Sequence, residues 1–469
     1  MKKSLLYTLA CIGFAGCVSI EGIDQLGNVS LRPTEAAASP PVLAAFEGDG
    51  AVTTPEDWQT RRAPLLREAI QRDLYGFQPD KVEIAETVSE QVSDSAYGGI
   101  AVLDAVTLTV RFSYEGGPDV ERDIRLAVAK PKNANGPVPV ILKMDTCPFD
   151  EGYQDESLPG GGRQLTLPVS AIPADQLPDP LPDELVGADT FETTVTATCK
   201  GQGGGLVSGL VQYSLGRYHD TPPVQEAVEQ GYAFASINIL DFVLDSGRYG
   251  GAQLELMSKG AAEETAWGSL AAWVFQYSRG IDYLETDPAL DPERMAIYGH
   301  SRFGKATLVA GALDPRIDMV IAHQSGRGGA ALFASDKGEP IGEMMANYPQ
   351  WLNKAYAERL ALGEALPFDQ HHVLALLAPR PVLLGHGRRD GWADPDGAFR
   401  AAIGANTRPM RSMARMDLRA IRCATLSHQM ILLTGCAAEP MAKRKKTGKL
   451  SSNFLTRILS HRLTELAVN

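Results

Sequence analysis

The chain has 469 residues, of which 44% are hydrophobic and 22% charged, which is the composition of an ordinary folded protein with one large domain or two smaller ones. Its formal net charge of -13 argues against nucleic-acid binding as the main activity, because phosphate backbones attract positively charged surfaces. The simplest explanation of this excess of acidic residues is that it keeps the protein soluble.

The N-terminus has the pattern of an export signal. Two lysines precede a short apolar run at residues 4–14, too short for a stable membrane-spanning helix, and small residues lead up to Cys17. We expect residues 1–17 to be a lipoprotein signal peptide and Cys17 to be lipidated, anchoring the protein in the periplasm or outer membrane. A plain signal peptide with a chance cysteine is the alternative. Residues 18–45, rich in Ala, Pro and Ser, are expected to form a flexible tether.

The six cysteines show no metal-binding pattern, because no pair has the spacing of a zinc ribbon. Cys147 and Cys199 lie in the main body and are candidates for a disulfide in an oxidising compartment. Spacing alone does not establish whether their geometry permits the bond.

The first half of the chain predicts one helix followed by three strands. The helix is expected from residue 55 to residue 75, because Pro and Glu stand in its first turn and its apolar side chains recur at helical spacing. The strands are expected at residues 106–112, 124–128 and 138–142. The segment 149–209, rich in Pro, Gly, Asp and Thr, is expected to be a loop.

From residue 232 onward, predicted strands and helices alternate. Strands are expected at residues 232–239, 295–298, 319–322 and 381–385. Helices are expected at residues 263–284, 302–313 and 373–377. This alternation predicts an α/β fold with a mainly parallel central sheet and helices on both faces.

The most specific motif is Y-G-H-S-R-F-G-K at residues 298–305, which joins a predicted strand to a predicted helix. Gly299, His300 and Ser301 form the first half of a nucleophile elbow, a sharp turn that lifts the serine hydroxyl out of the sheet and points backbone N–H groups toward an oxyanion. Phe303 occupies the place of the usual second glycine. The alternative is that Ser301 is an ordinary helix N-cap.

Further segments accompany this elbow. They are A-L-D-P-R-I-D-M-V-I-A-H-Q-S-G-R-G-G-A-A-L after the elbow helix, G-E-P at 338–340, L-P-F-D-Q-H-H-V-L-A-L-L-A-P-R-P-V at 366–382 and R-D-G-W-A-D-P-D-G at 389–397. Together with G-H-S-R-F-G-K they resemble the bacterial branch of carbohydrate esterase family 15, the glucuronoyl esterases. The resemblance implies an α/β-hydrolase fold for an esterase domain at residues 46–405, with Ser301 as the nucleophile.

The same resemblance implies roles for residues that match the family's motifs. Arg302 matches an arginine that stabilises the oxyanion, and Lys305 matches a lysine that binds the glucuronate sugar. Glu339 resembles a residue that contacts sugar hydroxyls. Trp392 resembles a tryptophan that packs against the uronate, to which an indole offers an apolar face and one N–H donor. Trp351 is the alternative for that role.

The acid of the catalytic triad departs from the family pattern. Gln324 stands where the family often has glutamate, and an amide does not carry the charge that stabilises an imidazolium. Other members use an acid after the strand that ends at Gly385, a place that Asp390 matches. Asp394 is the second candidate, and either aspartate could simply cap a turn.

The resemblance also implies a histidine base near the C-terminus, in a G-x-H setting followed by Asp-Trp, yet no such motif follows Asn406. His428 and His461 lie in basic surroundings without pattern. Without its base, a serine hydrolase loses on the order of a millionfold in kcat.

Residues 406–469 carry 12 Lys+Arg against 3 Asp+Glu, a charge of +9, so the rest of the chain carries -22. We interpret this stretch as an aberrant basic tail that results from a frameshift. Codons compatible with residues 429–448, read in another frame, can spell a sequence close to the family ending, its histidine included. Such a tail is expected to be poorly ordered, because a sheet edge and the final helix would be missing. A genuine basic tail is the alternative.

The sequence thus predicts a serine esterase of the 4-O-methyl-glucuronoyl methylesterase type, which hydrolyses lignin–carbohydrate esters of glucuronoxylan during xylan degradation. No metal or organic cofactor is expected, nor any nucleic-acid partner, and the protein is expected to be a monomer that touches a membrane only through its lipid. One alternative is an acetylxylan esterase or other carboxylesterase on the same fold. Another is a catalytically impaired carbohydrate-binding protein that lacks the triad histidine.

Overall fold

The computed structural model describes the main body of the chain and two short stretches of its tail. The described residues are 40–79, 81–113, 119–145, 162–168, 190–196, 224–239, 242–247, 249–258, 262, 266–387, 390–406, 416–422 and 428–435. The expected signal peptide, Cys17, most of the expected tether, Cys147, Cys199 and His461 lie outside these residues. Val42, near the end of the expected tether, is fully buried, so the folded body begins by this residue.

The expected N-terminal helix is present over its whole length. It runs as α3 (Pro55–Asp57), η1 (Trp58–Arg62), α4 (Ala63–Ile70) and η2 (Gln71–Tyr75), the two η segments being π-helical turns. Thr54 begins it with a capping box, in which its hydroxyl accepts from the N–H of Asp57 and the Asp57 carboxylate accepts from the Thr54 N–H. Gly76 ends it at a φ of 89°, a left-handed conformation that favours glycine.

One large sheet organises the described residues. Its strands, in spatial order, are β1 (Val82–Ser95), β2 (Ala101–Phe112), β3 (Val120–Pro131), β7 (Ala233–Asn238), β4 (Val138–Asp145), β8 (Leu290–His300), β9 (Met319–His323), β10 (Val382–Gly387), β12 (His428–Gly435) and β11 (Met416–Arg422). The central strands from β7 to β10 are parallel, and the strands beyond them on both sides pair antiparallel. The predicted parallel sheet is therefore confirmed at the centre, and its edges are antiparallel.

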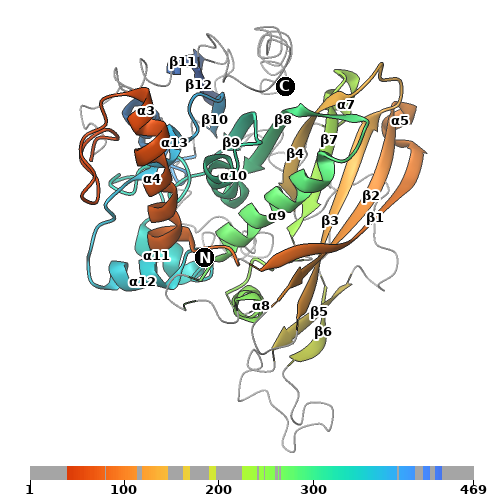
Figure 1. Cartoon of the computed structure of the whole chain (residues 1–469), viewed down its shortest axis with the longest axis horizontal. Helices are drawn as coiled ribbons and strands as arrows, with labels where there is room; N and C mark the ends of the chain where they lie inside the picture. Colours follow the sequence, from red (N-terminus) through yellow and green to blue (C-terminus); the bar gives the residue numbers. More distant parts are fainter. Residues whose placement is uncertain are drawn as a thin grey trace, which may run out of the picture.

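Helices pack on both faces of this sheet, as the alternation predicted (Figure 1). Besides the N-terminal helix they are α5 (Ala96–Gly99), α7 (Val224–Glu229), α8 (Tyr249–Met257), α9 (Ser269–Leu284), α10 (Arg302–Leu313), α11 (Ile341–Asn347), α12 (Lys354–Ala361), α13 (Gln370–Leu376) and α14 (Pro395–Ala405). Leu126 and Val128 of β3 belong to the main core, whereas Ala127 and Ala129 belong to a second core with α7. Neighbouring residues of one strand thus face opposite helix layers.

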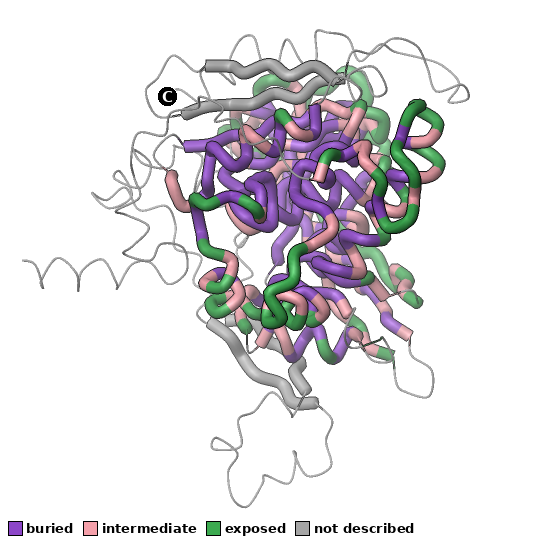
Figure 2. Tube along the Cα trace, turned by 90° about the vertical axis from the view of Figure 1, so that its left-hand side faces the viewer, coloured by how far each residue is buried: buried purple, intermediate pink, exposed green. Residues whose placement is uncertain are grey.

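Small residues let α10 approach the sheet closely. A Cβ on Gly311 would lie 2.5 Å from a methyl carbon of Val320 in β9, so only glycine fits there. The buried residues concentrate in the middle of the molecule (Figure 2). The N-terminus of α10 is thereby held at the carboxyl end of β8, where ligands bind in open α/β sheets.

Several features differ from the predictions, and three of them concern the strands. β1 is an additional strand with mostly exposed side chains, rich in Glu and Ser. The segment expected as a loop contains β5 (Gly162–Pro168) and β6 (Thr190–Thr196), which pair with each other in a separate two-stranded sheet. The expectation that the tail lacks a sheet edge is wrong for the described residues, because β12 pairs with β10 and β11 pairs with β12.

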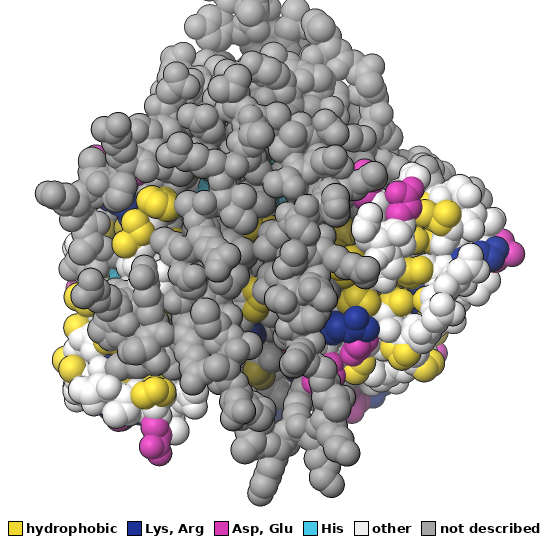
Figure 3. Space-filling model, turned by 90° about the horizontal axis from the view of Figure 1, so that it is seen from above, with side chains coloured by type: hydrophobic (Ala, Val, Ile, Leu, Met, Phe, Trp, Pro, Cys, Tyr) yellow, Lys and Arg dark blue, Asp and Glu magenta, His cyan; other side chains and the backbone are white. Residues whose placement is uncertain are grey.

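Side chains of both charges are scattered among hydrophobic and neutral ones on the described surface that is visible from above (Figure 3). Among the described helices, none has the length and apolar character that crossing a membrane requires.

Candidate active site

Ser301 lies in the sharp turn between β8 and α10. Its φ of 55° and ψ of -123° form a conformation that is rare and strained for a residue with a side chain. Its backbone N–H donates to the carbonyl of His323 at 2.9 Å, which fixes the turn to the end of β9. Its side chain makes no capping hydrogen bond to α10, so Ser301 is not an ordinary N-cap.

Close packing explains the glycines of this turn. A Cβ on Gly299 would lie 2.2 Å from Thr307 Oγ1 and 2.3 Å from the Phe303 carbonyl oxygen, so a side chain is excluded. A Cβ on Gly304 would lie 3.1 Å from each of its nearest neighbours, a tight fit rather than a clash. Phe303 packs its ring edge-on against Trp273, with ring centroids 5.4 Å apart. The elbow therefore accepts Phe303 because this side chain is part of a packed aromatic contact.

Arg302, the first residue of α10, is held between an acid and two rings. Its guanidinium forms an ion pair with Asp245, which lies in the loop after β7. Its central carbon lies 5.2 Å from the ring centroids of both Tyr348 and Trp351, which stack on each other with centroids 3.9 Å apart. The cation predicted beside the nucleophile is thus present and ordered by its neighbours.

Lys305 lies one turn further along α10 and is only 3% exposed. Its ammonium donates to the carbonyl oxygens of Ser325 at 2.9 Å and Arg327 at 2.5 Å, and it lies 5.5 Å from the ring centroid of Trp351. Burying an ammonium is costly unless such acceptors compensate it. Lys305 therefore adds a fixed positive charge on the same side of α10 as Arg302, and its contact with substrate remains a prediction.

Gln324 connects two residues of the sheet's carboxyl edge. It follows β9 with a φ of 47°, and its side-chain N–H donates to Asp390 Oδ2 at 2.8 Å. Its other end, Oε1, lies 2.8 Å from His300 Nε2. Because the amide oxygen can only accept, His300 Nε2 must be the donor. Gln324, which stands where the family often has glutamate, thus has a structural role that the motif did not reveal.

The structure separates the two candidate acids. Asp390 is half-buried, and its Oδ1 accepts from the backbone N–H of Ala393 at 3.2 Å while its Oδ2 accepts from Gln324. Asp394 is 2% exposed and caps α14, accepting from the N–H of Gly397 at 2.8 Å. Asp394 thus has the turn-capping role, whereas Asp390 lies beside the elbow's own neighbours.

Glu339 and Trp392 are brought together at this edge. The N–H of Glu339 donates to the carbonyl of Trp392 at 3.0 Å. Burial raises the pKa of the Glu339 carboxyl, and the positive charges of Lys305 and Arg302 oppose this rise. Trp392 is half-buried, whereas Trp351 is 3% exposed and donates its indole N–H to Asp245 at 2.7 Å. Trp392 is therefore better placed than Trp351 to contact a sugar.

Three of the described histidines are buried inside the fold. His371 donates to the carbonyl of Pro40 at 2.6 Å, His372 takes part in the capping of α13, and burial lowers the pKa of each. His386 in β10 is 1% exposed, and burial lowers its pKa to about 4. His428 begins β12 opposite Gly387, at the carboxyl end of β10. The histidine base that the resemblance implies stays a prediction.

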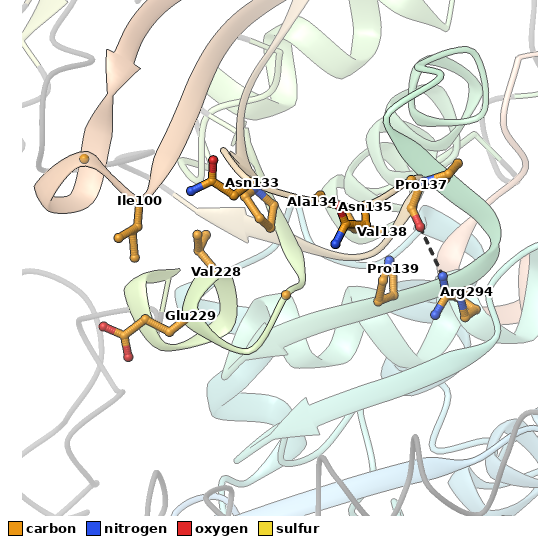
Figure 4. A pocket seen from close by; sticks show the side chains of 14 residues that line it. Ile100, Asn133, Ala134, Asn135, Pro137, Val138, Pro139, Val228, Glu229 and Arg294 are labelled. Carbon is orange, nitrogen blue, oxygen red and sulfur yellow. Dashed lines mark hydrogen bonds between the residues drawn. The ribbon is translucent and has the colours of Figure 1, made fainter.

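A separate open pocket of about 620 Å³ lies at the opposite ends of the central strands (Figure 4). It is lined by residues at the start of β4, by the end of α7 and by Arg294, which donates to the carbonyl of Pro137 at 3.2 Å. Ser301 follows the carboxyl end of β8, whereas this pocket adjoins its amino-terminal half. The pocket is therefore distinct from the elbow and its surroundings.

Sequence reasoning did not find Asp245 or Tyr348. Both lie far from the elbow in sequence and outside every motif quoted above. The only available signal was the position of Asp245 after a parallel strand, since loops at that edge supply functional side chains in α/β folds.

Comparisons with known proteins identify the family of this chain. The family model described as "Glucuronyl esterase, fungi" matches residues 255–408. Carbohydrate esterase MZ0003, from an unknown prokaryotic organism, is 30% identical over 358 residues, which are 76% of this chain and 74% of that protein. The 4-O-methyl-glucuronoyl methylesterase 1 of Wolfiporia cocos (strain MD-104) is 32% identical over 148 residues, which are 30% of this chain and 36% of that enzyme.

Solved structures show the same fold. A glucuronoyl esterase from Solibacter usitatus superimposes with a TM-score of 0.60 at 27% identity, covering 81% of this chain and 86% of that one. A promiscuous CE15 esterase from the marine bacterial metagenome superimposes with a TM-score of 0.59 at 25% identity, covering 83% of this chain and 89% of that one.

Proposed function

Because the chain belongs to carbohydrate esterase family 15, the family of the glucuronoyl esterases, we propose that it hydrolyses ester bonds between a glucuronate carboxyl group and an alcohol. The substrate class is the lignin–carbohydrate ester of plant glucuronoxylan. The observation that carries this proposal is the strained serine at the elbow, followed on the same helix by Arg302 and Lys305. No metal or organic cofactor enters the reaction as proposed.

The proposed reaction is acyl transfer through Ser301. Its Oγ attacks the uronyl carbonyl carbon as a base takes its proton, and the negative charge moves to the carbonyl oxygen. Arg302 and backbone N–H groups at the start of α10 stabilise that oxyanion. The alcohol leaves with a proton from the base, and water then cleaves the acyl-enzyme by the same steps in reverse. Asp390 orients the histidine base, with Gln324 and the N–H of Ala393 holding its carboxylate.

Recognition of the uronate rests on three residues around the elbow. Lys305 supplies a fixed positive charge, Glu339 supplies an acceptor for sugar hydroxyls, and Trp392 supplies an apolar face for the pyranose ring. An acetyl group offers neither hydroxyls nor a ring, so these residues favour a uronate over an acetate.

Substrate comparison tests this proposal. We expect a higher kcat/KM for a benzyl ester of glucuronate than for an acetylated xylan or a simple acetate ester, and we expect Trp392→Ala to reduce only the former. Equal or greater activity on acetate, unaffected by Trp392→Ala, would reassign the protein as a general carboxylesterase. Binding of the sugar without turnover by any version of the chain would favour a carbohydrate-binding role.

We further propose that Cys17 carries a lipid that anchors a monomeric enzyme in the periplasm or outer membrane. The small residues before Cys17 and the short apolar run support this. Cys17→Ser should move the protein from the membrane fraction to the soluble periplasm. An unchanged distribution would contradict the anchor, and light scattering of the purified soluble form tests the monomer.

A further inference from the structure

Asp245 lies in the loop after β7 and is 10% exposed in its side chain. Its carboxylate is shared by three donors from two other parts of the chain. Oδ1 accepts from the indole N–H of Trp351 at 2.7 Å and from the side-chain amide of Gln350 at 3.0 Å. Oδ2 forms the ion pair with the guanidinium of Arg302. One buried carboxylate thus joins the elbow helix to the segment that carries the stacked rings.

Arg302 is constrained from two directions by this arrangement. The carboxylate fixes one end of its planar guanidinium, and the Tyr348–Trp351 pair lies beside it, with both ring centroids 5.2 Å from its central carbon. An arginine side chain has many rotamers. Those that direct its charge away from a developing oxyanion must be excluded if the arginine is to stabilise that oxyanion. Its side chain is 15% exposed, so it is not fully closed off from solvent.

From this geometry we propose that Asp245 is a positioning residue for the reaction, which acts by holding Arg302 in the orientation that stabilises the oxyanion at Ser301. The inference rests on the proposed function only in taking Ser301 as the nucleophile, and it is independent of which ester is the substrate. Preorganised charge is effective because it needs no rearrangement when the transition state forms.

A purely structural role for Asp245 is the competing explanation. The segment that contains Gln350 and Trp351 has other attachments, however. The N–H of Ser269 donates to the Gln350 carbonyl at 2.7 Å, and the N–H of Leu270 donates to the Trp351 carbonyl at 3.2 Å. The start of α9 therefore holds this segment through its backbone, which leaves the ion pair with Arg302 as the feature that depends on the charge of Asp245.

A double-mutant cycle on the full chain tests the proposal. Asp245→Asn and Arg302→Ala are made singly and together, and the rate at which a fluorophosphonate labels Ser301 is measured at alkaline pH, where hydroxide replaces a histidine base. In this reaction the serine oxygen bonds to phosphorus and fluoride leaves, so the rate reports oxyanion stabilisation. Gln350→Ala is the matched control, because it removes another donor to the same carboxylate without touching Arg302.

We expect Asp245→Asn to slow labelling by about tenfold or more, and to have no further effect when Arg302 is already alanine. Gln350→Ala should stay within about twofold of the wild type. An unchanged rate for Asp245→Asn, or effects of the two substitutions that multiply, would overturn the proposal. If Asp245→Asn does not fold, Asp245→Glu applies the same test, because it keeps the negative charge but displaces it by one methylene group: we expect slower labelling, with no further effect when Arg302 is already alanine, and an unchanged rate contradicts us.

The same variants are then assayed with a benzyl glucuronate ester and with phenyl acetate. A positioning role predicts that Asp245→Asn lowers kcat for either ester that is turned over and leaves KM close to its original value. If only acetate is hydrolysed while the labelling cycle holds, the proposed function fails and the role of Asp245 stands. If the glucuronate ester is hydrolysed and the effects in the double-mutant cycle are additive, the proposed function stands and the role of Asp245 fails.

Discussion

Gln324 and Asp390 lie 66 residues apart in the sequence, yet the side-chain N–H of Gln324 donates to the carboxylate of Asp390 at 2.8 Å. The other end of the same amide bonds His300, the neighbour of the nucleophile. The amide therefore joins the ends of β8, β9 and β10 through side chains, at the edge where Ser301 is held. Because the residue at this position is uncharged, we expect Asp390 to be the carboxylate that orients a base.

The role of Asp390 predicts two different outcomes for two neighbouring aspartates. In the frame-restored chain, which regains a histidine base, Asp390→Asn should lower kcat by on the order of 10⁴-fold with little change in stability, because a neutral side chain no longer orients and stabilises an imidazolium. Asp394→Ala should lower the unfolding free energy by about 1 kcal/mol or more through loss of the α14 cap, with kcat largely retained. Kinetics and urea unfolding of both variants check this, and the reversed pattern would identify Asp394 as the acid.

The tail predicts a large effect of restoring the reading frame. If residues after Asn406 result from a frameshift, the chain encoded by the alternative frame regains a histidine base. We expect its kcat to exceed that of the present chain by on the order of a millionfold. DNA sequencing across the codons near residue 406 is the independent control. Equal activity of the two chains would show that the alternative frame supplies no base, and we would then take the basic tail as genuine.

The backbone strain at Ser301 predicts that one substitution there will raise the stability of the protein while it abolishes activity. Ser301→Gly removes the nucleophile and also places glycine at a φ of 55°, so we expect it to abolish turnover and to raise the unfolding free energy by about 1 kcal/mol. Ser301→Ala is the matched control, because it removes the hydroxyl while keeping the Cβ. Equal stabilities of the glycine and alanine variants would show that the elbow stores no strain.

His386 predicts a dependence of stability on pH. Burial lowers its folded-state pKa to about 4, whereas in the unfolded chain the pKa is near 6.5. As the pH falls from about 6.5 to about 4, the unfolded state binds a proton that the folded state does not, so the unfolding free energy decreases, by up to about 3 kcal/mol from this residue. His386→Leu should remove that part of the acid sensitivity, and neither ring nitrogen has a hydrogen-bond partner to lose among the described residues. Urea unfolding at neutral and acidic pH measures the difference, and parallel pH curves for both proteins would contradict it.

Elements with strong local signals were predictable from the sequence. The helix expected at residues 302–313 matches α10 at both ends, because the elbow motif at residues 298–305 marks the turn at its start. β1 was missed because its exposed face is rich in Glu and Ser and lacks the alternation of a half-buried strand. Its pairing with β2 is a tertiary contact that no local pattern reports.

In the candidate site, too, residues within one local motif were predictable and contacts between distant residues were not. Ser301, Arg302 and Lys305 are contiguous in the motif, so their joint position follows from the elbow itself. The contacts of Gln324 with His300 and Asp390 depend on the left-handed backbone conformation of Gln324 after β9. The ion pair that holds Arg302 depends on Asp245, which lies 57 residues before it in the chain. Such pairings are set by the order of strands in the sheet, which spacing along the sequence does not specify.

Hydrolysis of a benzyl glucuronate ester by the chain, by its frame-restored form and by the Ser301→Ala variant of each tests the central claim most directly. We predict that the frame-restored chain releases benzyl alcohol with Michaelis–Menten kinetics, and that Ser301→Ala lowers its kcat by on the order of a millionfold. Turnover that survives Ser301→Ala, or the absence of turnover in both forms of the chain, would contradict the account.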